Sequence, residues 1–222
     1  MLERLILVAA DIPVWAITTG RSNYLASCLR RFRNTFLFVN DADMVLRLAS
    51  TLANYFVFPS GTRIGGYRLG NLSISGRGRT DGYGWRSSDL RDLELHGVLQ
   101  ARPLSEQPFR CPQWIDYPLD VIDCTDYTDQ GRHLSAFTAG NALLRPLNYA
   151  ATLVLMLLAP LGIGQIDSHG GYFRGRFCMD MLYELALRGV PDQKERWDQI
   201  QAGLKQHRIS WISIPSGADA AP

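Results

Sequence analysis

The sequence is poor in the residues that hold metals and in paired cysteines. It contains 4 cysteines and 4 histidines among 222 residues, and no two cysteines form a C-x-x-C arrangement. The histidines and cysteines show no metal-ligand spacing, so we expect neither a metal nor a cofactor. The cysteines are expected to be free thiols in a reducing compartment, with one oxidised pair as the alternative; they are Cys28, Cys111, Cys124 and Cys178.

The sequence also has no large excess of positive or negative charge and no long apolar run. The formal net charge is +2, which is too small to indicate nucleic acid as a partner. Glu3 and Arg4 precede the first apolar run, and no small-residue cleavage site follows it, which argues against a signal peptide. The uncharged stretch 146–166 has a helical part, 147–159, shorter than the ~20 apolar residues that a bilayer requires. We therefore expect a cytoplasmic protein, with association to a membrane surface through 147–159 left open.

What the sequence does contain is an alternation of apolar strands and amphipathic helices. Residues 5–10 form a continuous apolar run, typical of a strand buried on both faces of a parallel sheet. A helical pattern over 22–32, a β-branched and aromatic run over 34–41 and a helical period over 42–56 follow, and "YPLDVIDCTDY" at 117–127 adds a strand. This order predicts an α/β fold with a mostly parallel sheet flanked by helices.

The predicted domain carries two additions. We expect a single domain over residues 1–212 and a disordered tail over 213–222. Residues 59–112 form a Gly/Arg-rich loop excursion, whose arginines suit an anionic surface but are more simply explained as solvated. Residues 128–166 form an insertion, and its apolar helix 147–159 is interpreted as a lid, an interfacial helix or part of the core.

Two loops that follow predicted strands carry the candidate catalytic residues. Asp41 and Asp43 lie in "VNDADMV", and His169 lies in "DSHGGYF". In an open parallel sheet, catalytic groups gather at the carboxyl ends of the strands. An aspartate followed much later by a histidine is the chain order of a Ser-Asp-His triad. In such a triad the aspartate orients the imidazole, and the histidine takes the proton of the serine.

Each candidate also has a purely structural explanation. Asp41 precedes a predicted helix and can cap it, in which case the other aspartate is the catalytic one. His169 can equally be a polar residue at the start of a helix. His133, in a polar stretch, is a rival base; His96 lies on an apolar segment and is expected to be structural, and His207 lies near the tail.

Two parts of the chain resemble a known superfamily. "FLFVNDADMVLRLASTLANYFVFPSGTRIGGYRLGN" resembles the stretch around the catalytic aspartate in a group of uncharacterised bacterial α/β-hydrolases. "DVIDCTDYTD" and "DSHGGYF" are similar to the final strand and the catalytic-histidine loop of that group. A looser resemblance connects the chain to fungal-type triacylglycerol lipases, which have "vN..DiVprlp" and a later "H..YF". The resemblance covers roughly 3–72 and 114–188, and implies that Asp43 is the acid and His169 the base. Asp41, the alternative acid, lies too early for the match.

The nucleophile of these families is missing. They carry their serine in G-x-S-x-G, and this sequence has no such pentapeptide. The run "LILVAAD" resembles the strand after the nucleophile helix, so the resemblance implies that the nucleophile strand and elbow precede Met1. We therefore expect a partial α/β-hydrolase fold, the carboxyl-terminal half of a serine hydrolase acting on a small-molecule or lipid-like ester. Such a half would be inactive alone. The alternative is a non-catalytic hydrolase-fold module that binds a membrane or a protein partner.

Overall fold

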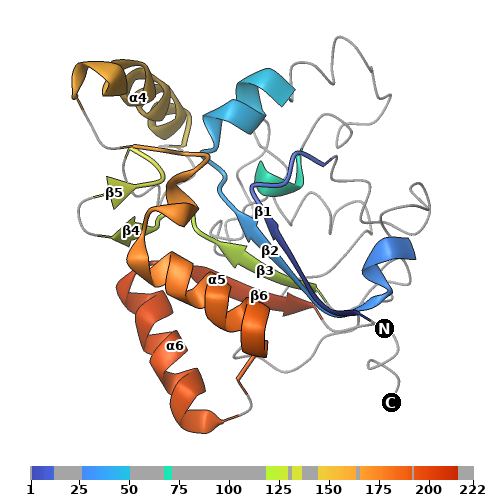
Figure 1. The fold of residues 1–222 in the computed structure, drawn as a ribbon. Coiled ribbons are helices and arrows are strands. Elements are labelled where there is room, and N and C mark those ends of the chain that lie inside the picture. Colours follow the sequence, from blue (N-terminus) through green and yellow to red (C-terminus); the bar gives the residue numbers. More distant parts are fainter. Residues whose placement is uncertain are drawn as a thin grey trace.

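A four-stranded mixed sheet with helices packed beside it forms the centre of the protein (Figure 1). The computed structural model describes residues 2–12, 27–50, 68–71, 119–129, 132–136, 145–163, 166–191 and 193–214. Most of the excursion predicted over 59–112, and residues 215–222 of the predicted tail, lie outside these ranges. The described elements agree with the predicted α/β class.

The sheet has the strand order β1-β2-β3-β6. Its first three strands are parallel to one another: β1 (Leu2–Val8), β2 (Phe32–Val39) and β3 (Leu119–Asp123). The fourth strand, β6 (Ser210–Ile214), pairs with β3 in the antiparallel direction. Because β1, β2 and β3 run the same way, the segments that follow them emerge at one edge of the sheet.

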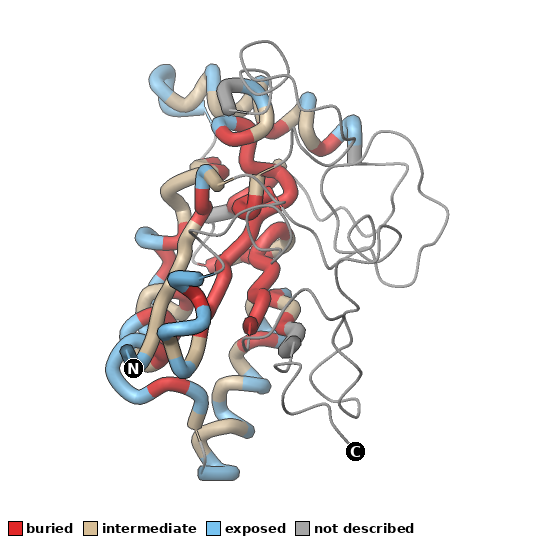
Figure 2. Tube along the Cα trace, turned by 90° about the vertical axis from the view of Figure 1, so that its right-hand side faces the viewer, coloured by how far each residue is buried: buried red, intermediate tan, exposed pale blue. Residues whose placement is uncertain are grey.

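The core is centred on the two middle strands. Every residue of β3 is buried, and so are the last five residues of β2, as the central red tube in Figure 2 shows. The run FLFV at the end of β2 and the pair Val121 and Ile122 in β3 suit strands covered on both faces. The prediction for the first strand was wrong in extent and burial. β1 begins at Leu2, ends at Val8 and is only half-buried, because it lies at one end of the described sheet.

The predicted helix over 22–32 ends earlier than expected. Only residues 27–29 of its range are described as helical, and Phe32 already belongs to β2. Leu29 is buried, whereas Cys28 is exposed. Two consecutive arginines make the turn between this helix and β2.

The helical period predicted over 42–56 is described only as far as residue 50. It includes a π-helical turn, η2 (Leu46–Ser50). A π-turn is wider than an α-turn and shifts the face that each following side chain occupies. Leu46 is buried, and Leu48 is exposed.

The carboxyl-terminal part adds two elements that the sequence patterns did not predict. Helix α6 (Lys194–Gln206) leads into β6, whose Trp211 packs edge-on against Phe36 at 6.2 Å and Trp197 at 5.4 Å between ring centroids. The Trp211 indole N–H also donates to Asp120 Oδ1 at 2.9 Å. Ser213 and Ile214 are part of β6, so the tail predicted to begin at 213 begins later; pairing with β3 orders these two residues.

Helix α5 (Arg176–Arg188) closes the segment that follows His169. It ends at Gly189, whose positive φ of 76° is a backbone conformation that glycine tolerates best. The Arg4 guanidinium of β1 donates to the carbonyls of Ala186 and Leu187 in its last turn. Helix α5 is thereby fixed to the sheet.

The helix predicted over 147–159 is present as α4 (Arg145–Leu158), followed by the 3-10 turn η5 (Ala159–Leu161). A small hairpin, β4 (Thr128–Asp129) and β5 (Arg132–His133), lies between β3 and α4 in the chain. Among the described helices, none has both the length and the apolarity needed to cross a membrane.

Candidate active site

Asp43 and His169 meet beyond the end of β2. Asp43 lies in the turn that follows this strand, and His169 lies in the turn before the 3-10 helix η6 (Gly171–Phe173). His169 Nδ1 lies 2.8 Å from Asp43 Oδ2. The Asp43 side chain is 0% exposed, whereas the His169 side chain is 43% exposed. A carboxylate that is shielded from solvent therefore contacts an imidazole that is partly exposed at the surface.

The two carboxylate oxygens of Asp43 have different partners. Oδ2 faces His169, while Oδ1 accepts the backbone N–H groups of Val45 at 3.1 Å and Leu46 at 3.2 Å. The two bonds to Oδ1 form the N-cap arrangement for the helical segment that begins at 44. The sequence had assigned the cap to Asp41 and the catalytic role to Asp43. Asp43 instead makes the capping bonds as well as the bond to His169.

The environment of Asp43 opposes ionisation in one respect and favours it in another. Burial raises the pKa of its carboxyl above the ordinary value of 3.8, and this desolvation outweighs the lowering by His169 and the two amides. Because the carboxylate accepts the Nδ1 proton, Nε2 is the imidazole nitrogen that carries the free lone pair. No described residue forms a hydrogen bond with Nε2.

Asp41 is buried and engaged elsewhere. Its Oδ2 accepts the hydroxyl of Tyr149 on α4 at 2.5 Å, and its Oδ1 forms an ion pair with Arg47. The Arg47 guanidinium also lies 4.1 Å from the centre of the Tyr149 ring. The alternative acid therefore connects the end of β2 to α4, and the described contact with His169 is made by Asp43.

Buried polar residues hold the acid turn and the base turn together. Asn40 Nδ2 donates to the Ser168 carbonyl at 2.7 Å, and Asn40 Oδ1 accepts the Ala42 N–H at 2.9 Å. From the other side, Ser168 Oγ accepts the Met44 N–H at 3.2 Å. Asn71 Nδ2 donates to the carbonyls of Asn40 and Asp43 at 3.1 and 3.2 Å. The separation of Asp43 and His169 is thus set by bonds on both sides.

Sequence reasoning did not identify these positioning residues. Their signals were present in the quoted motifs, because Asn40 precedes the two aspartates and Asn71 ends the "GYRLGN" block. Their role depends on partners far away in the chain, since Asn40 and Ser168 are separated by 128 residues. A single sequence does not show such a pairing.

The glycines after His169 allow its turn to pack closely. Asp167 Oδ1 accepts the Gly170 N–H at 2.7 Å, and a Cβ on Gly170 would lie 2.9 Å from Asp167 Oδ2. A Cβ on Gly171 would collide with the side chain of Leu134. A larger residue at either position would require the side chain of Asp167 or Leu134 to move.

The other histidines are placed differently. His207 Nδ1 lies 2.8 Å from the Thr128 carbonyl oxygen, and its ring stacks on Phe177 at 4.6 Å between centroids, which is a structural role. His133 lies in β5, but its side chain is outside what the structure describes, and so is the whole of His96.

The described cysteines, Cys28, Cys124 and Cys178, are free thiols, as predicted. Burial raises the pKa of the Cys124 thiol. Cys111 lies outside the described residues. In the parts of the chain that the structure describes, no three His, Cys, Asp or Glu side chains are grouped as metal ligands would be.

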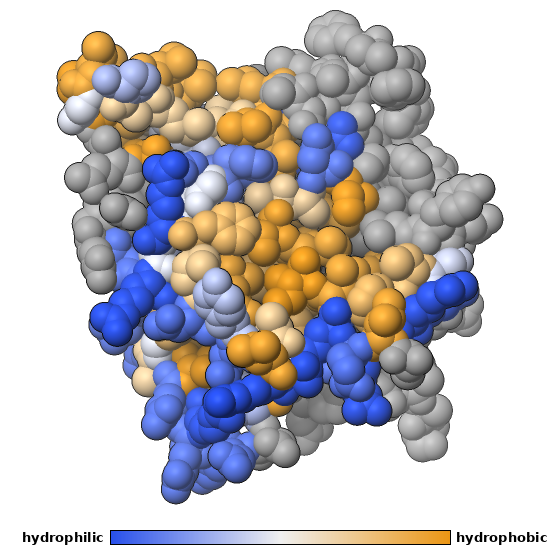
Figure 3. Space-filling model, in the orientation of Figure 1, coloured by the Kyte–Doolittle hydropathy of each residue, from blue (hydrophilic) through white to orange (hydrophobic). Residues whose placement is uncertain are grey.

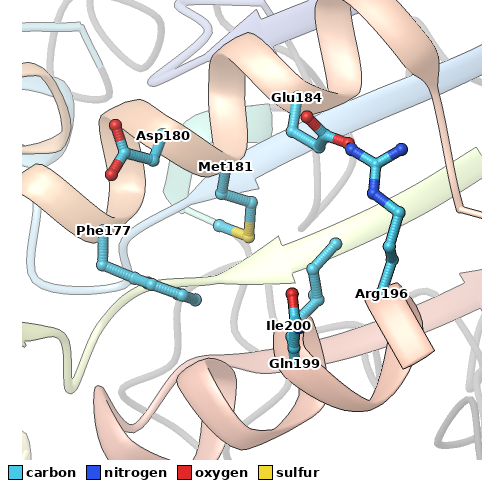
Figure 4. A pocket seen from close by; sticks show the side chains of 7 residues that line it. All are labelled: Phe177, Asp180, Met181, Glu184, Arg196, Gln199 and Ile200. Atoms are coloured by element: carbon cyan, nitrogen blue, oxygen red, sulfur yellow. The ribbon is translucent and has the colours of Figure 1, made fainter.

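A cavity of about 270 Å³ lies between α5 and α6, away from the Asp43–His169 pair (Figure 4). Its apolar lining comes from Phe177, Met181 and Ile200, and Glu184 and Arg196 meet as an ion pair across it. Neither Asp43 nor His169 lines this cavity, so it is not part of the candidate active site.

Comparison of the chain with protein-family models, curated proteins and solved structures gives no match. The functional argument therefore depends on the geometry. An imidazole that is partly exposed and oriented by a buried carboxylate can transfer a proton at Nε2.

Proposed function

We propose that Asp43 and His169 are the acid and base of a triad of the serine-hydrolase type. The observation that carries this proposal is the 2.8 Å contact between a fully buried carboxylate and a partly exposed imidazole. The order of the elements supports it, because the acid directly follows β2 and the base comes later in the chain, after β3, the β4–β5 hairpin and α4. The same order is implied by the resemblance to bacterial α/β-hydrolases, and the proposed fold is part of an α/β-hydrolase.

The proposed chemistry is cleavage of an ester or a related acyl bond. His169 Nε2 takes the proton of an attacking hydroxyl while Asp43 stabilises the imidazolium that forms. His169 then returns the proton to the leaving group when the acyl bond breaks. General-base assistance of this kind contributes about 10²–10⁴-fold to a rate.

The proposal assigns the acid and the base and does not assign a nucleophile. No serine in the sequence lies in G-x-S-x-G, and residues 20–24, "GRSNY", end in tyrosine where that pattern has glycine. We therefore expect that a fluorophosphonate probe does not label this chain. Labelling of any serine would overturn this part of the proposal and would identify the nucleophile directly.

We propose an apolar acyl group as the substrate's main recognition feature. Helix α4 lies beside the base, since the Ser168 hydroxyl donates to Met156 Sδ at 3.0 Å. The apolar side chain of Met156 beside the base turn suits a small-molecule or lipid-like ester better than a charged one. Equal reactivity of the His169-dependent process toward acetyl and longer acyl esters would contradict this preference.

The acid–base pair can be tested without a serine. An imidazole with a free Nε2 lone pair takes the acetyl group of p-nitrophenyl acetate and releases p-nitrophenolate, which is followed by absorbance. Asp43→Asn presents an N–H donor to Nδ1, so the proton moves to Nε2 and the lone pair is lost. We expect this variant to lower the His169-dependent rate by roughly 10²-fold, and His169→Ala to abolish it.

Two controls separate this effect from general damage. Asp41→Asn alters a neighbouring buried carboxylate that contacts Tyr149 and Arg47, and His207→Gln alters a histidine with a structural role. Both are expected to keep the His169-dependent rate. A rate that falls as much in Asp41→Asn as in Asp43→Asn would show that the pair has no special role.

A second candidate function is a non-catalytic module with a hydrolase-like fold that binds a protein partner or a membrane. The exposed apolar side chains of α4 favour it. The two candidates differ in the p-nitrophenyl acetate test, because a binding module does not require a reactive His169.

A further inference from the structure

Helix α4 is amphipathic in the reverse of the usual sense, with its polar face turned inward. Asn148 and Thr152 are completely buried, and Thr152 Oγ1 accepts the Ala136 N–H at 2.9 Å. Tyr149 donates to Asp41, and Met156 accepts from Ser168. The polar side chains of α4 are therefore used to attach it to the rest of the protein.

The apolar face of α4 is turned to solvent. Leu147, Ala150, Val154 and Leu157 are exposed, and η5 continues this stripe with Leu161. Figure 3 shows apolar surface over this helix, at the upper left. The steps between successive members are three, four, three and four residues. This is the spacing of a seam between two packed helices, since the a and d positions of a heptad recur in the same way.

The chemistry of the stripe distinguishes between a helix and a lipid surface as its partner. Helices that lie in a membrane interface carry Lys or Arg on their polar face and aromatic residues on the other. Helix α4 has one charged residue, Arg145 at its start, and residues 146–163 contain none; the aromatic residue among them, Tyr149, contacts Asp41. A narrow aliphatic stripe without a row of basic residues along it fits the equally apolar stripe of another helix.

The stripe is also symmetric along its length. Leu147 and Leu161 each lie seven residues from Val154, and Ala150 and Leu157 lie four and three residues from it. Two such stripes in antiparallel orientation place Leu157 near Ala150 of the other helix and Leu147 near Leu161. A twofold axis through Val154 relates the two stripes, so that both copies make the same contacts.

We propose that this face is a dimer interface, in which α4 and η5 pair antiparallel with the same elements of a second copy of the chain. One helical stripe per copy makes a small interface, near the lower limit of about 1,000 Å² for a specific one. The expected dimer is therefore one that dissociates on dilution. The pairing does not depend on the proposed hydrolase function.

The first test is the oligomeric state by sedimentation equilibrium over a range of protein concentrations. The wild-type chain is expected to form a reversible dimer. Leu161→Glu introduces a charge into the seam and is expected to weaken the dimer by about tenfold or more. The matched control is Leu187→Glu on α5, because Leu187 and Leu161 are both 73% exposed. Circular dichroism establishes that both variants keep the helical content of the wild type.

The second test locates the twofold axis. In a Cys28→Ser, Cys111→Ser background, Val154→Cys is expected to give a disulfide-linked dimer with a mild oxidant such as oxidised glutathione. Leu187→Cys in the same background is expected to give much less. A linked dimer from Val154→Cys supports the proposed geometry even where a charged variant folds poorly.

Three results would overturn the proposal. They are a wild-type chain that stays monomeric at every concentration, an equal loss of dimer in Leu161→Glu and Leu187→Glu, and a failure of Val154→Cys to cross-link. Flotation with neutral phosphatidylcholine vesicles covers the lipid alternative. A monomeric chain that floats, and stops floating in Leu161→Glu, would assign the stripe to a membrane surface instead.

Discussion

At the scale of single residues, Asp43 combines two tasks that usually belong to different side chains. One oxygen contacts His169 and the other caps the helical segment that begins at 44. Its burial is the dominant influence on its protonation, because desolvation raises the pKa of its carboxyl above the ordinary 3.8. This shift has a measurable effect on stability.

The sign of that effect follows from proton linkage. Above pH 3.8 and below the raised pKa, the folded state binds the Asp43 proton more tightly than the unfolded state does. The contribution of Asp43 to stability is therefore full at low pH and is lost as the pH rises through the raised pKa. We expect the free energy of unfolding of wild type, relative to Asp43→Asn, to fall over this window in urea denaturation.

Asp198→Asn, on the exposed side of α6, serves as the matched control for this measurement. A difference between wild type and Asp43→Asn that stays constant with pH would contradict the prediction. A difference that grows with pH would mean that the hydrogen bonds to the carboxylate outweigh its burial.

At the scale of elements, α4 is attached to the protein by a few polar contacts. The most direct is the 2.5 Å hydrogen bond from the Tyr149 hydroxyl to the buried Asp41 carboxylate. The Arg47 guanidinium lies against both residues. The attachment of α4 therefore includes a charge-assisted bond.

Tyr149→Phe tests this attachment. The change removes the hydroxyl and leaves a buried carboxylate oxygen without that donor, which should lower the free energy of unfolding by about 1.5–3 kcal/mol. Tyr183→Phe is the matched control, because Tyr183 is an exposed residue of α5. Equal urea midpoints for the two variants would show that the bond contributes nothing to stability.

The sequence predicts those elements whose evidence is local. β2 follows from its β-branched and aromatic run and β3 from Val121 and Ile122 at its centre, and the end of α5 coincides with Gly189. The start of α5 has no local signal, since its N-cap is Gly175 and makes no side-chain capping bond. Its first turn is satisfied from a distance by Asp129, whose Oδ2 accepts the Phe177 N–H at 3.0 Å.

The candidate site shows the same division. The order of an aspartate turn and a histidine turn after successive strands indicated where to look. It did not show that Asp43 makes the capping bonds and that Asp41 contacts α4, because both aspartates precede the same helix. Asn40 and Ser168 decide which aspartate contacts His169, because they join segments that are distant in the chain.

At the scale of the whole molecule, the sheet is completed by the last described strand. β6 runs opposite to the other three strands, and its Trp211 joins the sheet to α6 through contacts with Phe36 and Trp197. Much of the core therefore depends on β6, which lies next to the tail that the sequence patterns predicted.

Trp211→Ala should lower the free energy of unfolding by about 3–5 kcal/mol, because it leaves a large cavity and removes the partner of Asp120. Equilibrium denaturation in urea measures this loss. Phe173→Ala, at an exposed aromatic residue, is the comparison and is expected to change stability little. A Trp211→Ala chain as stable as wild type would mean that β6 is not part of the cooperative core.

The double role of Asp43 has a consequence for how related sequences are interpreted. A lineage that lost the proposed activity would still be selected to keep Asp43, since the residue begins a helical segment in the core. The partly exposed His169 side chain would have no such protection and would drift once catalysis was lost. Among relatives, retention of the histidine is therefore the informative mark of activity, and retention of the aspartate alone records only selection for folding.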